Sequence, residues 1–134
     1  MKTFIAVYLA VVSLVFFSIK QDNKLKESIE RGSAVYEDFC VTCHLPTGKG
    51  VTGSFPPLAE SDYLIKNREE SIRGIKYGQK GEITVNGKKY NGFMAPLGLA
   101  DDEVADVMNY ILNSWGNKSD KIVTEEEVAK IKKN

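Results

Sequence analysis

The chain has 134 residues, and its 18 basic and 18 acidic side chains give a formal net charge of zero at neutral pH. Its length indicates one domain, and the balanced charge excludes the polycationic surface that is typical of nucleic-acid-binding proteins. Hydrophobic residues make up 43% of the chain and aromatic residues 10%, which indicates a globular protein rather than a disordered one.

The N-terminal segment differs in composition from the rest of the chain. A short basic start precedes residues 4–19, which are apolar except for two serines. This is the pattern of a secretory signal peptide, although no convincing cleavage site follows it, and the apolar run falls just below the roughly 17–25 residues that span a bilayer. A buried core helix is disfavoured because the segment is apolar all round. We therefore expect export, with residues 1–20 as a signal peptide or N-terminal membrane anchor and residues 21–134 as the mature domain.

The first half of that domain is predicted to be helical, with one long loop. Apolar positions three and four residues apart predict a helix over residues 23–40. Residues 45–57 contain three glycines and three prolines, which predicts a loop. Two short helices follow. The first begins at Ser61 or Asp62, and the second begins with a capping box at 67–70 and stops at Gly78.

The second half is predicted to contain a hairpin and two helices. Extended runs on both sides of Asn86-Gly87 predict a β-hairpin over residues 83–90. Apolar residues on one face predict a helix over 101–115, with Gly116 as its stop. A tail helix is expected over 124–133, beginning with the capping box at Thr124. Its docking residues would be Val128 and Ile131.

The segment Cys40-Val41-Thr42-Cys43-His44 contains both cysteines and the only histidine of the chain. Cys-x-x-Cys-His is the attachment motif of c-type haem, in which the two thiols bond the haem vinyl groups and the imidazole reaches the iron. Three alternatives are open. A redox dithiol lacks the βαβ pattern expected around it, a disulfide would leave His44 without a role, and a zinc site would need a carboxylate or a second chain to complete four ligands.

A second axial ligand for the iron has two internal candidates. Met108 lies on the apolar face of the 101–115 helix, where a core side chain is expected. Met94 lies in residues 90–98, a loop bounded by glycine and proline, where iron coordination would explain it and simple packing is the alternative. We therefore expect His44 and Met94 as metal ligands. Such a pair raises the haem potential and fills both axial positions, which favours electron transfer over catalysis.

In their order, these residues resemble a class I (monohaem) c-type cytochrome over roughly residues 25–131. The resemblance implies an all-α cytochrome c fold, in which the N- and C-terminal helices cross around a covalently bound haem and a short β-hairpin precedes the Met-ligand loop. It implies close helix crossing at Gly32, with Tyr36 and Tyr110 as aromatic partners. It also implies that the carbonyl of Pro56 accepts a hydrogen bond from His44 Nδ1 and that Leu58 packs on the haem.

Residues 83–117 are similar to those of bacterial cytochromes and cytochrome domains that accompany periplasmic dehydrogenases or copper nitrite reductases, or that feed terminal oxidases. Two features depart from the pattern. Ala95 separates Met94 from the following proline, and Ala100 stands where a Ser or Thr helix cap is usual, so that Asp101 is expected to cap instead.

The resemblance implies one covalent haem c with iron, no catalytic residues, and one-electron transfer in the periplasm or at the outer face of the inner membrane. The donor would be a dehydrogenase or quinol-oxidising complex, and the acceptor an oxidase or reductase. Two alternatives are a cytochrome subunit of a larger dehydrogenase or oxidase complex, and a small haem enzyme or gas sensor with a dissociable Met94. Residues 66–89 hold seven basic and three acidic side chains, which form either a partner-docking surface or an ordinary solvated face.

Overall fold

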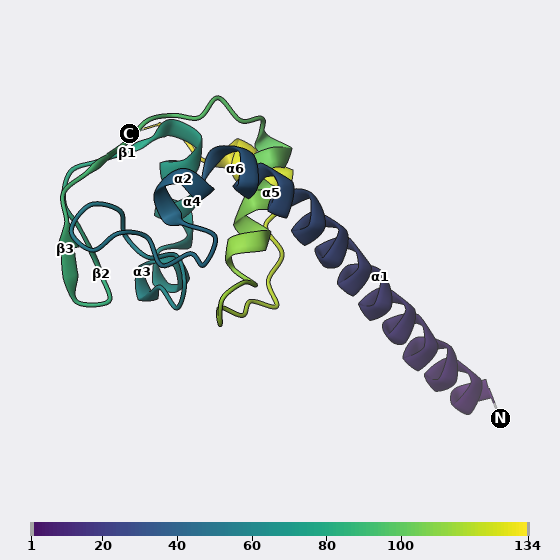
Figure 1. The fold of residues 1–134 in the computed structure, drawn as a ribbon. Coiled ribbons are helices and arrows are strands. Elements are labelled where there is room, and N and C mark those ends of the chain that lie inside the picture. Colours follow the sequence, from purple (N-terminus) through teal and green to yellow (C-terminus); the bar gives the residue numbers. More distant parts are fainter. Residues whose placement is uncertain (1, 134) are drawn as a thin grey trace.

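One long helix dominates the shape of the molecule. The structure is a computed structural model that describes residues 2–133, so that Met1 and Asn134, the outer bounds of the predicted export segment and domain, lie outside it. Helix α1 (Lys2–Phe39) runs without interruption from the apolar N-terminal segment to Cys40 and extends well beyond the other elements (Figure 1). The predicted helix over 23–40 is thus the C-terminal part of a longer one, because the polar residues 21–24 include no glycine or proline to end it. Within residues 2–133, no helix combines the length and the apolar character that a membrane crossing requires.

The remaining elements are short and lie toward the C-terminal end of α1 (Figure 1). The helices are α2 (Val41–His44), α3 (Asp62–Lys66), α4 (Arg68–Tyr77), α5 (Asp101–Ile111) and α6 (Glu125–Lys130). The strands are β1 (Gln79–Lys80), β2 (Ile83–Val85), β3 (Lys88–Tyr90) and β4 (Phe93–Met94).

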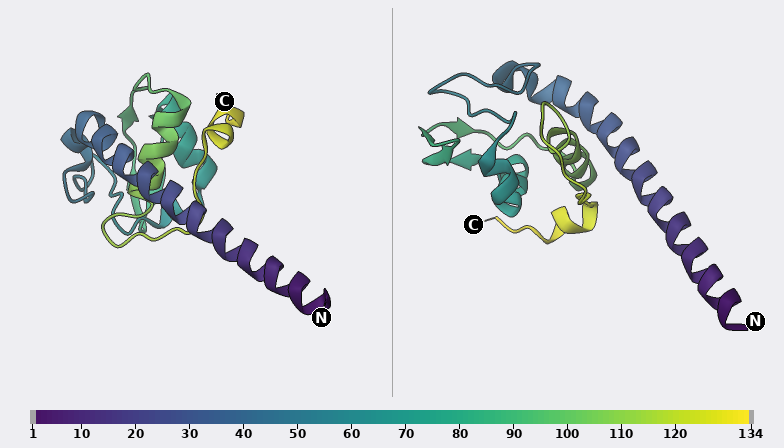
Figure 2. Two further views of the ribbon diagram at one scale, coloured as in Figure 1. Left: turned by 90° about the vertical axis from the view of Figure 1, so that its right-hand side faces the viewer. Right: turned by 90° about the horizontal axis from the view of Figure 1, so that it is seen from below.

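The crossing of α1 and α5 forms the centre of the fold, and both views in Figure 2 show α5 lying against the C-terminal half of α1. A Cβ atom at Gly32 would lie 2.0 Å from the carbonyl oxygen of Asp106 and 2.9 Å from Cβ of Tyr110. The rings of Tyr36 and Tyr110 meet with centroids 5.4 Å apart. The close, aromatic-lined crossing that the family resemblance implied is therefore present.

The strands form two separate antiparallel pairs. β2 and β3 make the predicted hairpin, with Ile83 opposite Tyr90. Asn86 and Gly87 both have positive φ, 50° and 74°, as a tight two-residue hairpin turn requires. The second pair joins β1 to β4, with Gln79 opposite Met94. This pair was not predicted, because two-residue strands are too short to show an alternating pattern.

Several predicted helix boundaries need correction. α5 ends at Ile111 rather than residue 115, and at Trp115 the backbone takes a positive φ of 50°. Asp101 does not cap this helix. Ala100 is the N-cap residue, its backbone N–H donates to Glu103 Oε2 (2.8 Å), and Asp101 instead pairs with Lys76.

Two capping predictions at the other helices have different outcomes. Ser61 caps α3 as expected, because its hydroxyl accepts from the backbone N–H of Leu64. The capping box at 67–70 is absent, since the side chain of Asn67 donates to the carbonyl of Tyr63 rather than capping α4. Gly78 does end α4, as predicted.

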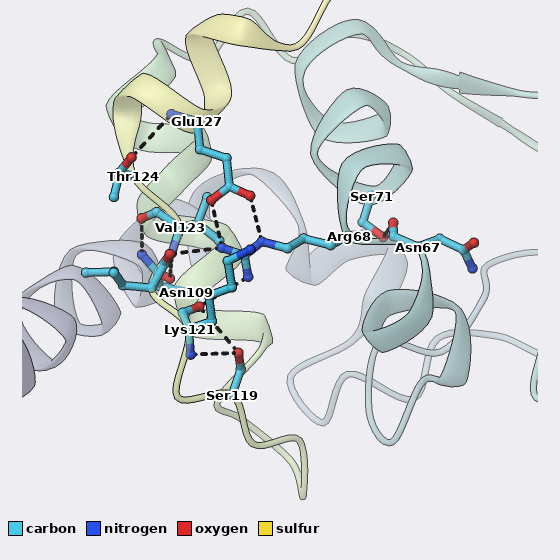
Figure 3. A network of polar contacts seen from close by, with 10 residues as sticks. Asn67, Arg68, Ser71, Asn109, Ser119, Lys121, Val123, Thr124 and Glu127 are labelled. Carbon is cyan, nitrogen blue, oxygen red and sulfur yellow. Dashed lines mark hydrogen bonds and ion pairs between the residues drawn. The ribbon is translucent and has the colours of Figure 1, made fainter.

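The C-terminal tail docks on α4 and α5 through polar contacts (Figure 3). Arg68 donates to both carboxylate oxygens of Glu127 at 2.7 and 2.8 Å. Asn109 accepts from the backbone N–H of Val123 (2.7 Å) and donates to its carbonyl (2.9 Å). As predicted, Thr124 caps α6 and the side chains of Val128 and Ile131 are buried, although the helix ends at Lys130.

Candidate haem-binding site

An apolar cavity lies between the end of α1, the loop before α3, helix α4, the hairpin and β4. Its volume of about 360 Å³ is in the range of roughly 300–1,000 Å³ that is usual for cofactor pockets. Among the described residues that line it, Glu70 is the only acidic one, and neither lysine nor arginine is present. The walls therefore suit a large apolar ligand that is held by a few specific groups.

The residues that the sequence singles out come together in this cavity. Its lining includes Cys40, Cys43, His44, Pro56, Leu58 and Met94. The two cysteines and His44 come from the end of α1 and from α2, whereas Met94 comes from β4. The competing candidate, Met108, is fully buried on α5 and packs in the hydrophobic core, which is the role expected of it.

The Cys-x-x-Cys-His segment forms a single helical turn. The backbone N–H of His44 donates to the carbonyl of Cys40 at 2.9 Å, and that of Cys43 donates to the same carbonyl at 3.2 Å. Side chains three and four positions apart on a helix share one face. The two thiols and the imidazole therefore point toward the same cavity.

The surroundings of Cys40 disfavour a thiolate there. Neither cysteine is in a disulfide, and burial, reinforced by the neighbouring Cys43, raises the pKa of Cys40 to about 11. Redox dithiols need a thiolate with a lowered pKa, so this environment disfavours a redox role. The residues described here also hold no cluster of three or more metal-ligating His, Cys, Asp or Glu side chains, as a zinc site would require.

The imidazole of His44 is oriented by the loop that ends at Pro56. Nδ1 of His44 lies 3.0 Å from the carbonyl oxygen of Pro56. A carbonyl only accepts hydrogen bonds, so Nδ1 is the protonated nitrogen and the lone pair of Nε2 is free for a metal. Burial lowers the pKa of His44, while the bond to Pro56 opposes that shift. The imidazole is thus neutral, which is the form that ligates metals.

Met94 is held in place by contacts that sequence reasoning missed. Its strand pairs with β1, directly after α4. Gly78, at the end of α4, has a φ of 85°, and a Cβ atom there would lie 2.7 Å from the carbonyl oxygen of Met94. The glycine was identified only as a helix stop. It directly precedes β1, a strand too short to show a pattern that would have indicated the close approach.

These residues fit a covalently bound haem. Two thiols and an imidazole stand on one helical face, a thioether lies in the same cavity, and apolar side chains form the walls. The protein's part in such a site is to position the cofactor and tune its electronics.

The basic stretch at residues 66–89 is largely neutralised within the chain. Five of its seven basic side chains form ion pairs with acidic residues: Lys66 with Asp62, Arg68 with Glu127, Arg73 with Glu69 and Glu70, Lys76 with Asp101, and Lys89 with Glu82. This pairing favours the ordinary solvated face over a docking surface.

The helix crossing, the Cys-x-x-Cys-His turn and the cavity together define a c-type cytochrome domain. The Cytochrome c family model matches residues 29–115. The chain is 41% identical over 110 residues to cytochrome c-552 of Thermus thermophilus, an alignment that covers 75% of this chain and 83% of that protein. The chain belongs to the cytochrome c family, binds haem c covalently and transfers electrons.

Longer relatives contain a similar domain. The chain is 31% identical over 105 residues to the cytochrome c subunit of a quinone alcohol dehydrogenase from Gluconacetobacter polyoxogenes, covering 75% of this chain and 22% of that subunit. It is 30% identical over 127 residues to the cytochrome c subunit of gluconate 2-dehydrogenase from Pantoea cypripedii, covering 85% of this chain and 28% of that subunit.

Proposed function

We propose that Cys40 and Cys43 carry the haem, that His44 and Met94 are its two axial ligands, and that the chain shuttles single electrons between respiratory partner proteins without catalysis of its own. The observation that supports this most directly is that all four side chains line one apolar cavity. Filled axial positions would leave no coordination site for oxygen or peroxide.

The side chains of the site divide this work among them. The haem supplies an iron that exchanges one electron when it is bound. His44 offers a neutral nitrogen, and the Pro56 carbonyl fixes the plane of its ring and raises its basicity. Met94 offers a soft thioether, which favours the reduced iron. Leu58 and the other apolar walls exclude water from the haem face, while Cys40 and Cys43 prevent its loss.

The partners are proposed to be redox proteins, namely a dehydrogenase or quinol-oxidising complex as donor and an oxidase or reductase as acceptor. The relatives named as dehydrogenase subunits support a redox partner in general. Because the chain is 41% identical to the cytochrome c-552 relative and only 30% and 31% identical to the two dehydrogenase subunits, we favour a separate carrier over a subunit of a larger complex. We place it in the periplasm, with residues 1–20 as an export segment that is cleaved or kept as an anchor.

The ligand assignment is tested by replacing each methionine. Ferric haem with a methionine ligand shows a weak long-wavelength charge-transfer band. Met94→Ala should abolish this band, whereas Met108→Leu, a matched change of the buried core methionine, should keep it. Loss of the band only in the Met108 variant would show that the assignment is wrong. Rapid carbon monoxide binding by the ferrous wild-type protein would instead support a gas sensor with a dissociable Met94.

The assembly and the export segment are tested on protein purified from its native membrane fraction. Intact mass reports both the covalent haem and the presence of residues 1–20. A larger subunit that co-purifies in fixed proportion would contradict the separate carrier.

A further inference from the structure

The backbone immediately after His44 takes an unusual conformation. Leu45 has a φ of 64°, in the left-handed region that side chains larger than glycine rarely adopt. Such a conformation persists only where surrounding contacts hold it in place. The contacts around Leu45 therefore hold an unfavourable backbone conformation in place, in addition to packing.

Two aromatic side chains bind the carbonyl groups of this segment. The hydroxyl of Tyr36, on α1, donates to the carbonyl of Leu45 at 2.7 Å. The indole N–H of Trp115, beyond the end of α5, donates to the carbonyl of Pro46 at 3.0 Å. Two consecutive carbonyls after the haem-attachment motif are thus held by one group from α1 and one from the segment that follows α5.

The two donors are themselves fixed. The rings of Tyr36 and Trp115 lie 4.9 Å apart, and each lies 5.4 Å from the ring of Tyr110. The Trp115 ring also covers Gly48, where a Cβ atom would come within 2.4 Å of it. The aromatic cluster therefore cannot shift without moving the loop that it binds.

The same loop carries the hydrogen-bond partner of His44. The backbone N–H of Gly50 donates to the carbonyl of His44 at 3.0 Å, and the carbonyl of Gly48 accepts from the backbone N–H groups of Leu58 (2.7 Å) and Ala59 (2.9 Å). Pro56 lies between these fixed points. Residues 45–59, which we call the frame, are thus a loop fixed by hydrogen bonds along its length. The frame holds the Pro56 carbonyl against the imidazole of His44.

We propose that the Tyr36 hydroxyl and the Trp115 indole N–H are positioning groups for His44. By holding the Leu45 and Pro46 carbonyls, they keep the Pro56 carbonyl on Nδ1 and so set how strongly the imidazole donates to the iron. This inference rests on the proposed ligand role of His44. A hydrogen bond at the second ring nitrogen raises ligand basicity, and a more basic ligand stabilises the ferric form. Loosening the frame should therefore raise the reduction potential.

The experiment uses the holoprotein and the variant Tyr36→Phe, which removes one hydroxyl and keeps the ring. Tyr110→Phe is the matched control, because it also removes one hydroxyl from the same aromatic cluster. The Tyr110 hydroxyl has no hydrogen-bond partner among the described residues. The readouts are the exchange rate of the His44 Nδ1 proton, followed by NMR, and the reduction potential. Exchange should become about fivefold faster in Tyr36→Phe, the factor for one net hydrogen bond of about 1 kcal/mol. The potential should become more positive, and both quantities should stay at wild-type values in the control.

Trp115→Phe provides a second, independent variant that should change the same two quantities in the same direction, including where Tyr36→Phe fails to fold. The proposal is overturned if the folded variants keep wild-type exchange rates and potentials and show only a lower melting temperature. That result would mean that Tyr36 and Trp115 contribute packing alone. The wild-type spectrum separates this failure from that of the proposed function. Without a haem-shifted His44 ring signal, the ligand assignment itself is wrong, and both proposals fall with it.

Discussion

At the scale of single residues, Gly32 is the position with the least freedom in the helix crossing. The carbonyl of Asp106 occupies the place where any larger side chain would begin. The carboxylate of Asp106 also ties the two helices together, because it accepts hydrogen bonds from Ser28 (2.6 Å) and from Arg31 (2.6 and 2.9 Å). α5 can therefore not retreat from an added methyl group without breaking the buried contact with Ser28 and the partly buried contacts with Arg31.

We predict that Gly32→Ala destabilises the holoprotein by about 3 kcal/mol or more, the upper end of the cost of an overpacked core. Ala34→Gly is the control, since it changes a single methyl group in the opposite direction at an exposed position of the same helix. Its cost should be about 1 kcal/mol, the helix propensity of glycine relative to alanine. Denaturant unfolding measures both. Equal losses in the two variants would contradict the close crossing.

At the scale of elements, α6 shows how a short helix far along the chain becomes part of the domain. Val128 and Ile131 bury their side chains against the core, and Arg68 binds Glu127 with two hydrogen bonds. A helix of six residues is not stable in isolation. Its order therefore depends on these contacts with α4 and α5.

The Arg68–Glu127 pair makes this docking depend on pH. The hydrogen bonds from Arg68 lower the pKa of Glu127 below its ordinary value of 4.5. A lowered folded-state pKa gives a stabilisation that is present above the ordinary value and is lost as the pH falls through the lowered one. We expect Glu127→Gln to cost about 1 kcal/mol at neutral pH, after allowance for partial exposure of the pair. The melting temperatures of variant and wild type should converge in acid.

Glu125→Gln provides the control, because Glu125 lies in the same first turn of α6, is exposed, and has no ion-pair partner among residues 2–133. It should melt as the wild type does across the pH range. A constant difference between Glu127→Gln and wild type down to acid pH would show that the carboxylate charge does not hold the tail.

The elements also show which parts of the fold a sequence can predict. The crossing helices, the hairpin at Asn86-Gly87 and the cap at Thr124 each have a local signal, either apolar spacing, turn chemistry or a capping side chain. The β1–β4 pair has none, since its register is fixed by the approach of Gly78 to Met94 across the fold. Asp101 was predicted to cap because the nearest local acceptor was considered alone. Its carboxylate is instead taken by Lys76 of α4, a contact that only the tertiary structure provides.

At the scale of the whole molecule, the haem cavity and the hydrophobic core are one structure. Leu64, Val107 and Ile111 belong to the buried core and also line the cavity. Six residues of the cavity lining could be singled out from the sequence. Attachment chemistry fixes the spacing of Cys40, Cys43 and His44, the loop bounded by glycine and proline indicated Met94, and family resemblance supplied Pro56 and Leu58. The aromatic hold on the loop after His44 could not be predicted, since it depends on where Trp115 lies after α5 has ended.

This sharing of walls predicts that the domain does not fold stably without its cofactor. Cys40→Ala combined with Cys43→Ala removes both covalent bonds to the haem. An apolar cavity costs about 24 cal/mol per Å³, so 360 Å³ corresponds to something on the order of 9 kcal/mol. That cost is comparable with the whole stability of a typical domain, about 5–15 kcal/mol. We therefore expect the double variant to lose helical circular dichroism and cooperative melting.

Met94→Ala is the matched control for this prediction, because it alters one cavity wall and leaves both cysteines in place. It should keep the covalent haem and melt cooperatively at a reduced temperature. A double cysteine variant with native helicity and a cooperative transition would show that the packing of α1, α5 and α6 stabilises the domain by itself. In that case the fold would form first and the haem would bind to it afterwards. We expect the opposite, because Leu64, Val107 and Ile111 belong to both the core and the cavity wall, so that the haem completes the core.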